Sequence, residues 1–191
     1  MFIVSKLEPF IDSRGSFLKI MEDGIYPKNS EIIHQGFKPI QSFITVTDKN
    51  AIRGMHFYKS TKSNNVLKFQ PQIEGSSLTG GGIYKSLLVL SGEIFFAAID
   101  LRADSNLFGK VRTKTIRKNN QVSIPRMVAT GFQVLSTKAT ILYFLDSVHK
   151  PDEDITINPT SCGISWPHPL GAISNRDLQA STLDEYIEML R

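Results

Sequence analysis

The chain has 191 residues, 41% hydrophobic and 21% charged, which is enough for one domain with a sizeable core, and no change of composition divides it. Its net charge of +4 is scattered along the chain, which argues against a nucleic-acid-binding protein and suits an anionic small-molecule substrate. A single cysteine excludes an internal disulfide, and neither a signal-peptide pattern nor an apolar stretch of roughly 18 residues occurs. We therefore expect one cytoplasmic domain over residues 1–191 with no membrane contact.

The first half of the chain contains few regular elements. Residues 12–15 predict a tight turn, because glycine after polar residues suits a positive φ, and residues 17–20 are expected to form a short strand. A loop-rich connection over residues 21–39 follows. Residues 40–47 are rich in β-branched and aromatic side chains in an alternating pattern, which predicts a strand.

From residue 58 to residue 82 the chain is polar and irregular, with one hairpin arm expected at 66–73. A loop of this length in a compact domain is usually functional or disordered. Beyond it, short apolar or alternating runs predict strands at the spacing of a β-sandwich or barrel: residues 85–90, 93–99, 110–116, 121–124, 131–135 and 140–145. Residues 182–190 have the apolar spacing of an amphipathic helix. No βαβ rhythm or glycine-rich fingerprint occurs, so we predict an all-β protein.

The segment Arg53-Gly-Met-His56 places a cation and an imidazole three residues apart. In a regular strand these side chains would face opposite sides, so both can line one cavity only if the backbone turns or bulges near Gly54. Taken alone, His56 is more simply interpreted as a half-buried structural histidine. It has no partner in a His-x-His arrangement and the other histidines are scattered, so the sequence predicts no metal site.

Further motifs accompany this segment in a fixed order. They are Asp12-Ser-Arg14-Gly15-Ser-Phe17, Arg53-Gly-Met-His56, Lys85, Gly92-Glu-Ile, Asp100-Leu-Arg102, Phe108-Gly-Lys110, Ile124-Pro125 with Gly131-Phe132, and Gly163-Ile-Ser-Trp166-Pro167. Each is weak alone, but together, over roughly residues 8–178, the set resembles the dTDP-4-dehydrorhamnose 3,5-epimerase family. The resemblance implies a cupin-like jelly-roll β-sandwich, assembled as a homodimer, that binds a nucleotide-diphosphate sugar and uses neither a metal nor another cofactor.

The resemblance also implies catalytic roles. A 4-keto sugar has acidic protons beside its carbonyl, and a base that removes one, with an acid that returns one from the opposite face, inverts that centre. By resemblance His56 is the base, Lys85 stabilises the enolate oxygen, and Tyr143 returns the proton. Without the other motifs, Tyr143 would be interpreted as an ordinary strand aromatic.

The same resemblance implies substrate-binding residues. Arg53 and Arg14 match positions that contact the diphosphate, where a guanidinium can pair two phosphate oxygens. Phe17 and Gln41 match residues that help to hold the nucleotide. Asp100 matches an acidic residue beside the lysine, and a turn residue at a strand end is an equally good interpretation of it.

The sequence departs from the family pattern at several places. Thr130 replaces an active-site histidine, and Val148, next to His149, replaces a second tyrosine. Asn158 is the nearest match to the aspartate that orients the catalytic histidine, and an amide cannot stabilise an imidazolium by charge. The connection between His56 and Lys85 is longer than the family usually has.

Three functions therefore stay open. The first is epimerisation of a nucleotide-linked 4-keto-6-deoxy sugar at two carbons, favoured by His56, Lys85 and Tyr143 together. The second is epimerisation at one carbon, or ketoisomerisation, on another nucleotide sugar, favoured by Thr130 and Val148. The third is a catalytically weakened sugar-nucleotide-binding jelly roll, for which Asn158 is the main support.

Overall fold

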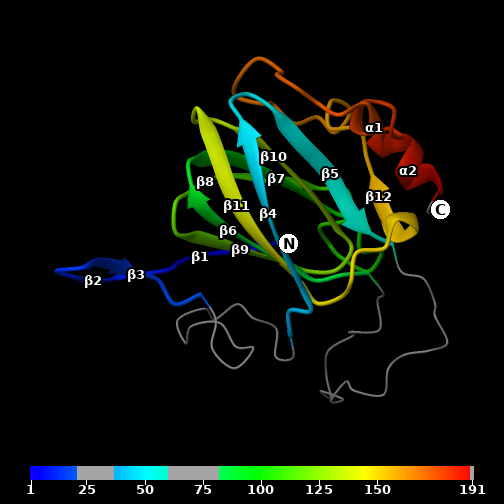
Figure 1. Ribbon diagram of the computed structural model, residues 1–191. Coiled ribbons are helices and arrows are strands. Elements are labelled where there is room, and N and C mark those ends of the chain that lie inside the picture. Colours follow the sequence, from blue (N-terminus) through cyan, green and yellow to red (C-terminus); the bar gives the residue numbers. More distant parts are fainter. Residues whose placement is uncertain (21–36, 60–81, 190–191) are drawn as a thin grey trace.

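The computed structural model describes residues 1–20, 37–59 and 82–189, and two five-stranded antiparallel sheets dominate it (Figure 1). One sheet has the strand order β1-β9-β6-β11-β4 and the other β12-β5-β10-β7-β8. The strands of the first are β1 (Ile3–Lys6), β9 (Asn120–Ile124), β6 (Lys85–Ser91), β11 (Lys138–Leu145) and β4 (Gln41–Asp48). Those of the second are β12 (Asp154–Thr156), β5 (Ile52–Tyr58), β10 (Val128–Val134), β7 (Glu93–Asp100) and β8 (Val111–Arg117). The all-β sandwich predicted from the sequence is confirmed.

The core lies between the two sheets. Buried side chains of β6 and β11, such as Leu87 and Ile141, belong to the same apolar cluster as Ile94 and Phe96 of β7. Phe2 packs edge-on against Phe96, with ring centroids 5.0 Å apart. Each such side chain contributes roughly 1.5–3 kcal/mol by leaving water, so this cluster fixes how the sheets face each other.

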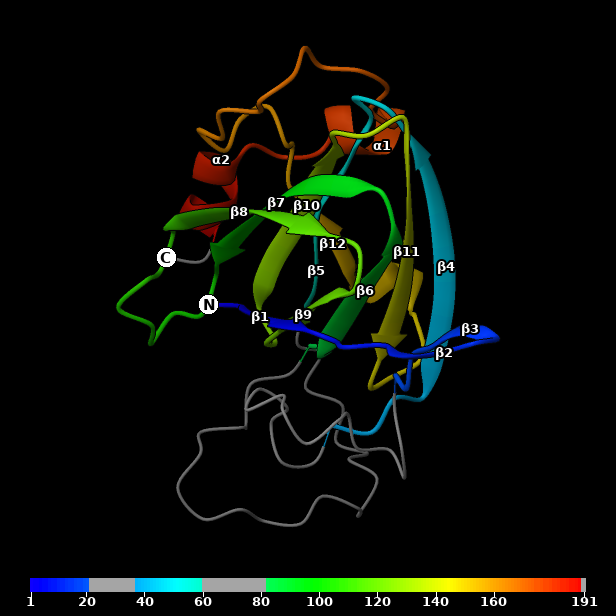
Figure 2. The same cartoon turned by 90° about the vertical axis from the view of Figure 1, so that its left-hand side faces the viewer.

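A second apolar cluster covers the outer face of the sheet that contains β5. Met55 and Phe57 of β5 pack there with residues of the C-terminal segment, including Tyr186, whose ring lies 5.2 Å from that of Phe57. This segment holds two short helices, α1 (Asn175–Leu178) and α2 (Leu183–Met189), and Figure 2 shows α2 and β4 on opposite sides of the molecule. The C-terminal segment is thereby fixed against β5, which brings α1 to the strand that carries His56. Neither helix in the described part of the chain is long and apolar enough to cross a membrane.

The expected strands after residue 84 are all present, and the expected C-terminal helix corresponds to α2. The strand predicted at 17–20 is wrong, because the turn after Asp12 instead closes a hairpin of β2 (Phe10–Asp12) and β3 (Gly15–Phe17). Gly15 has φ +129°, as the turn requires. The strands β1 and β2, the 3₁₀ turn η1 (Pro151–Glu153), β12 and α1 were not predicted. The expected arm at 66–73 and most of the loop-rich connection at 21–39 lie outside the described residues.

The irregularity expected near Gly54 is confirmed. Gly54 has φ +116°, and the pairing of β10 with β5 shifts register between Thr130 and Phe132, opposite this glycine. A Cβ on Gly54 would lie 2.5 Å from the Cα of Gly131 and 2.6 Å from the carbonyl oxygen of Thr130. The close approach of the β5 and β10 backbones therefore requires glycine at position 54. With the backbone bent at this point, Arg53 and His56 both line one pocket.

Replacing Gly54 with alanine is expected to lower the free energy of unfolding by at least about 3 kcal/mol, because the Cβ meets backbone that cannot move aside. Gly163→Ala is the matched control. Gly163 also has a positive φ, +64°, but nothing lies within 4 Å of its added Cβ, so the loss should stay near about 1 kcal/mol. Chemical denaturation followed by tryptophan fluorescence measures both. Equal losses would contradict the close approach at Gly54.

Candidate active site

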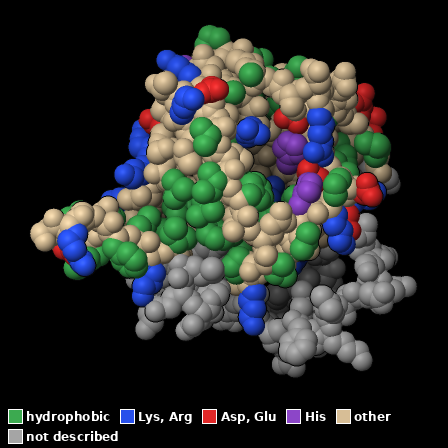
Figure 3. Space-filling view, viewed as in Figure 1, with side chains coloured by type: hydrophobic (Ala, Val, Ile, Leu, Met, Phe, Trp, Pro, Cys, Tyr) green, Lys and Arg blue, Asp and Glu red, His purple; other side chains and the backbone are tan. Residues whose placement is uncertain are grey.

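A pocket of about 700 Å³ lies between the sheets, within the size range of small-molecule sites. Figure 3 shows it as a hollow with histidine side chains at its edge. Both sheets and the segment around α1 line it. Of the residues proposed from the sequence, it brings together Gln41, Arg53, His56, Lys85 and Tyr143.

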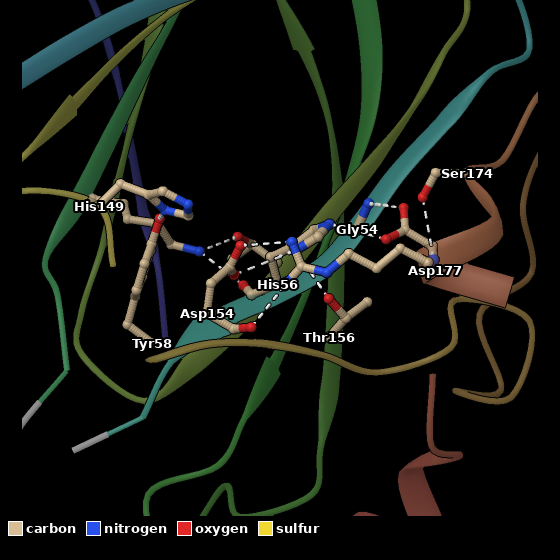
Figure 4. Close-up of polar contacts among 11 residues, drawn as sticks. Gly54, His56, Tyr58, His149, Asp154, Thr156, Ser174 and Asp177 are labelled. Atoms are coloured by element: carbon tan, nitrogen blue, oxygen red, sulfur yellow. Dashed lines mark hydrogen bonds and ion pairs between the residues drawn. The ribbon is translucent and has the colours of Figure 1, made fainter. Parts of the chain in front are cut away.

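His56 stands between two carboxylates at the centre of this pocket (Figure 4). Its Nε2 lies 3.1 Å from Oδ1 of Asp177, and its Nδ1 lies 3.4 Å from Oδ1 of Asp154. The hydroxyl of Thr156 is also 3.2 Å from Nδ1. Arg176 donates to the other oxygen of Asp154 at 2.9 Å. Two anions and one hydroxyl therefore fix the plane of the imidazole ring.

Asp177 reaches His56 through the local structure of α1. Ser174 caps this helix, and its Oγ accepts a hydrogen bond from the backbone N–H of Asp177 at 3.1 Å. The second carboxylate oxygen of Asp177 accepts from the backbone N–H of Gly54 at 3.4 Å. Because Asp177 is 3% exposed, its charge is shielded little by water and acts strongly on the ring.

The electrostatics of this cluster favour the imidazolium form. Burial has the largest single effect on His56 and lowers its pKa, but Asp154 and Asp177 together raise that pKa above its ordinary value of 6.5. Burial alone would raise the pKa of both carboxyls, yet the adjacent His56 ring, as an ion-pair partner, holds each pKa below its usual range. The Oδ1 atoms of Asp154 and Asp177 are buried without a well-aligned hydrogen-bond donor, so the charge of the ring is what compensates them.

Lys85 lies next to His56 and is also buried, with 8% exposure. Its Nζ donates to the carbonyl oxygen of His56 at 2.8 Å and to Oγ1 of Thr130 at 2.9 Å. Burial lowers the pKa of Lys85 to about 8, while the charge of Asp154 opposes that shift. Thr130, which occupies the position of a histidine in the family pattern, thus accepts a hydrogen bond from Lys85.

Tyr143 faces the pocket from β11 and stacks on Phe43 of β4, with ring centroids 4.8 Å apart. Burial raises its pKa well above the ordinary value, and the charge of Arg53 only partly offsets this. The hydroxyl therefore keeps its proton near neutral pH and is able to donate it. Arg53 itself donates from Nε to Oγ1 of Thr47 at 2.8 Å, which directs its guanidinium along the pocket wall.

Other residues proposed from the sequence lie outside the pocket. Arg14 and Phe17 are on the exposed β2–β3 hairpin, where Arg14 pairs with Asp12 at 2.6 Å. Asp100 is fully buried at the end of β7 and accepts hydrogen bonds from Arg102 and Ser105. It occupies a strand end and does not line the pocket.

The interpretation of Asn158 as the residue that orients His56 is wrong. Its amide nitrogen donates to the carbonyl oxygen of Leu178 at 2.8 Å, and its amide oxygen accepts from the backbone N–H of Thr160 at 2.9 Å. These contacts fasten the loop after β12 to the end of α1. The ring contacts carboxylates instead, one from β12 and one from α1.

Sequence reasoning missed several pocket residues: Tyr58, His149, Asp154, Arg176 and Asp177. One local signal was available, because Ser174-Asn-Arg-Asp177 has the Ser-x-x-Asp spacing of a helix start. Nothing in that spacing indicates that the carboxylate turns toward β5. Within residues 1–20, 37–59 and 82–189, no group of three or more His, Cys, Asp or Glu side chains is arranged to hold a metal ion.

Comparisons with known proteins agree with this architecture. A dTDP-4-dehydrorhamnose 3,5-epimerase from Neisseria gonorrhoeae is 28% identical over 93% of this chain, and the chain spans 48% of that relative's length. The structure of a dTDP-6-deoxy-D-glucose-3,5-epimerase from Legionella pneumophila with dTDP-4-keto-L-rhamnose superposes with a TM-score of 0.77 at 22% identity, covering 96% of this chain and 88% of the other.

A 3'-monoepimerase from Streptomyces bikiniensis in complex with dTDP-quinovose has a TM-score of 0.76 at 20% identity, covering 98% of this chain and 86% of the other. These likenesses confirm the expected cupin-like jelly roll. The family model described as dTDP-4-dehydrorhamnose 3,5-epimerase matches residues 82–185, which is more than half of the chain. The chain belongs to the dTDP-4-dehydrorhamnose 3,5-epimerase family.

Proposed function

We propose that this chain epimerises a dTDP-linked 4-keto-6-deoxy sugar at the carbons that flank its carbonyl. One observation carries the proposal: a histidine backed by a buried carboxylate shares a pocket with a buried lysine and a half-buried tyrosine. These three groups match the needs of the reaction, which are a base, a cation for the enolate oxygen and an acid.

In this mechanism His56 takes a proton from the carbon beside the ketone, and the electron pair of that bond moves onto the carbonyl oxygen. Lys85 stabilises the resulting enolate by its charge. Tyr143 then gives its proton to the opposite face of the same carbon, which inverts the centre and restores the ketone. Tyr143 regains a proton from solvent, and His56 releases to solvent the proton that it took. Arg53 pairs with diphosphate oxygens through its guanidinium, and Gln41 contacts the nucleotide.

Asp177 and Asp154 have different parts in this mechanism. Asp177 has the shorter contact with the ring and stabilises the imidazolium formed by proton transfer. Asp154 contacts Nδ1 at 3.4 Å and has an alternative partner in Arg176. In this proposal the substrate approaches His56 at Nδ1, where it displaces the Thr156 hydroxyl and Asp154, and Asp154 turns toward Arg176.

Incubation with dTDP-4-keto-6-deoxyglucose in heavy water tests the proposal. Deuterium at both C3 and C5 supports epimerisation at two carbons, and deuterium at one supports the single-centre alternative, for which Thr130 in place of a histidine is the specific observation. If the nucleotide sugar binds while neither carbon exchanges, the epimerase proposal fails for this substrate. The binding-only alternative has lost its main support, because Asn158 is not the partner of His56.

The roles of His56 and Lys85 predict a bell-shaped pH dependence of kcat/KM for exchange. The base must be neutral, so the rate rises with pH through the raised pKa of His56, above 6.5. The lysine must be charged, so the rate falls again around its pKa of about 8. Lys85→Arg keeps the charge at all working pH values, so its profile should lose the alkaline limb. An unchanged alkaline limb in this variant would contradict the assignment of that limb to Lys85.

We also propose that the chain forms a homodimer in which the β2–β3 hairpin reaches the pocket of the second copy. The hairpin projects from the body of the protein (Figure 1). Its Phe10 and Phe17 side chains are 64% and 62% exposed. Ile44 and Val46 of the edge strand β4 are also exposed, at 57% each. Arg14 and Phe17 would then contact the nucleotide bound to the partner.

Light scattering coupled to gel filtration measures the mass of the wild type and of an Ile44→Glu variant. A dimer is expected for the wild type, and a shift toward monomer for the variant, because a carboxylate in an apolar interface is left unpaired. A monomeric wild type would contradict both the assembly and the nucleotide contacts of Arg14 and Phe17.

A further inference from the structure

Tyr58 and His149 form a hydrogen-bonded pair at one end of the pocket that the mechanism above does not use. The Tyr58 hydroxyl oxygen lies 2.7 Å from Nδ1 of His149, and both side chains line the cavity (Figure 4). Tyr58 is at the end of β5, and His149 is in the connection between β11 and β12. Two segments 91 residues apart in the chain therefore place these groups together.

The imidazole of His149 is held in one orientation. Its backbone N–H donates to Oε1 of Gln41 at 2.6 Å, and its ring meets the Tyr58 ring edge-on, with centroids 5.8 Å apart and an interplanar angle of 83°. Tyr58 is 7% exposed, and burial raises its pKa to about 12, with the charge of Asp154 adding to the shift. The phenol therefore keeps its proton and is able to donate it to Nδ1 across the 2.7 Å contact; in that arrangement the ring proton of His149 lies on Nε2.

Nε2 of His149 is available to a ligand bound in the pocket. Within the described part of the chain, no group hydrogen-bonds Nε2 of His149, although the side chain lines the pocket. Tyr58 is two residues beyond His56 on the same face of β5, about 6.6 Å along the strand, which is comparable with the width of a pyranose ring. Arg53 also lines the pocket and precedes His56 on the same strand, whereas Tyr58 follows it.

We propose that His149 is a specificity-determining residue that donates a hydrogen bond from Nε2 to a hydroxyl oxygen of the bound hexose. Tyr58 is a positioning residue that fixes the tautomer required for this donation. The inference rests on the proposed function, since a sugar whose reacting carbon faces His56 extends toward this pair. It concerns the choice of sugar rather than the proton transfer.

The tautomer is tested without any substrate. Long-range ¹H–¹⁵N correlation spectra of labelled wild type, assigned by comparison with His149→Gln, should show His149 protonated on Nε2 and unprotonated on Nδ1. In Tyr58→Phe this preference should weaken, because the donor to Nδ1 is gone. A wild-type His149 protonated on Nδ1 would overturn the inference, because Tyr58 would then accept the hydrogen bond.

The ligand contact is tested with two matched variants. In His149→Gln the amide nitrogen takes the place of Nε2, so the donor toward the ligand is kept and the partner of Tyr58 is lost. In His149→Asn the amide takes the place of Nδ1, so the partner of Tyr58 is kept and the donor is lost. We expect His149→Asn to weaken binding of dTDP-glucose by about tenfold, with dTDP binding unchanged, while His149→Gln stays within about threefold of wild type.

A purely structural role for the pair predicts the reverse order, with His149→Asn tolerated and His149→Gln destabilised, and that result would overturn the inference. If wild type exchanges deuterium while His149→Asn has an unchanged affinity for dTDP-glucose, the inference fails and the proposed function stands. If wild type exchanges none while His149→Asn still loses affinity for dTDP-glucose and not for dTDP, the proposed chemistry fails and the contact stands.

Discussion

Replacing His56 with alanine is expected to lower the rate of deuterium exchange by about 10²- to 10⁴-fold, because the reaction loses its base. Lys85 and Tyr143 stay in the pocket, so dTDP should still bind with nearly unchanged affinity. The measurement is exchange at C3 and C5 of dTDP-4-keto-6-deoxyglucose in heavy water, together with calorimetric titration of dTDP. The two readouts separate the loss of chemistry from the loss of the pocket.

His168→Ala is a suitable control for this substitution. His168 contacts Gln133 through its backbone N–H and carbonyl oxygen, which alanine retains, and it does not line the pocket. Exchange by this variant should match that of wild type. If His56→Ala exchanged as fast as His168→Ala, the base would have to be sought elsewhere among the pocket residues.

The fold was predictable because its strands carry their signal locally. Alternation and β-branched residues mark residues 41–48, and glycine, asparagine or proline interrupts the chain between successive strands from β6 to β10. Two elements that were missed near the site, β12 and α1, have three and four residues, too few for a period to be seen. Their positions depend on packing against β5, which is a property of the folded chain.

The three proposed catalytic residues were predictable from local sequence motifs, but the partner of His56 was not. His56, Lys85 and Tyr143 sit on strands whose neighbours carry recognisable motifs. The partner of His56 was not predictable from spacing, because Asp177 is 121 residues away in sequence and reaches the ring through the capped turn at Ser174. Asn158 precedes a proline near the place where the family pattern has its aspartate, yet its hydrogen bonds stabilise the loop in which it lies.

A comparison of Asp177→Asn with Asp154→Asn should distinguish the two carboxylates at His56. Asp177→Asn is expected to lower kcat by as much as about 10⁴-fold, because the amide neither stabilises the imidazolium nor fixes the reactive tautomer. Asp154→Asn should lower kcat by no more than about tenfold, since the contact of Asp154 with the ring is longer and Arg176 shares it. Asp184→Asn, on the exposed first turn of α2, is the control and should leave the rate unchanged.

The pH profiles of these variants distinguish the effect of each carboxylate on the pKa of His56 from its effect on kcat. Both carboxylates raise the pKa of His56, so removal of either should move the acid limb of kcat/KM to lower pH. If Asp154 only contributed charge, Asp154→Asn would show this shift with little loss of maximal rate, whereas Asp177→Asn would show the shift together with a large loss. A larger loss of kcat in Asp154→Asn than in Asp177→Asn would reverse the assignment, placing the substrate at Nε2 and the stabilising carboxylate at Nδ1.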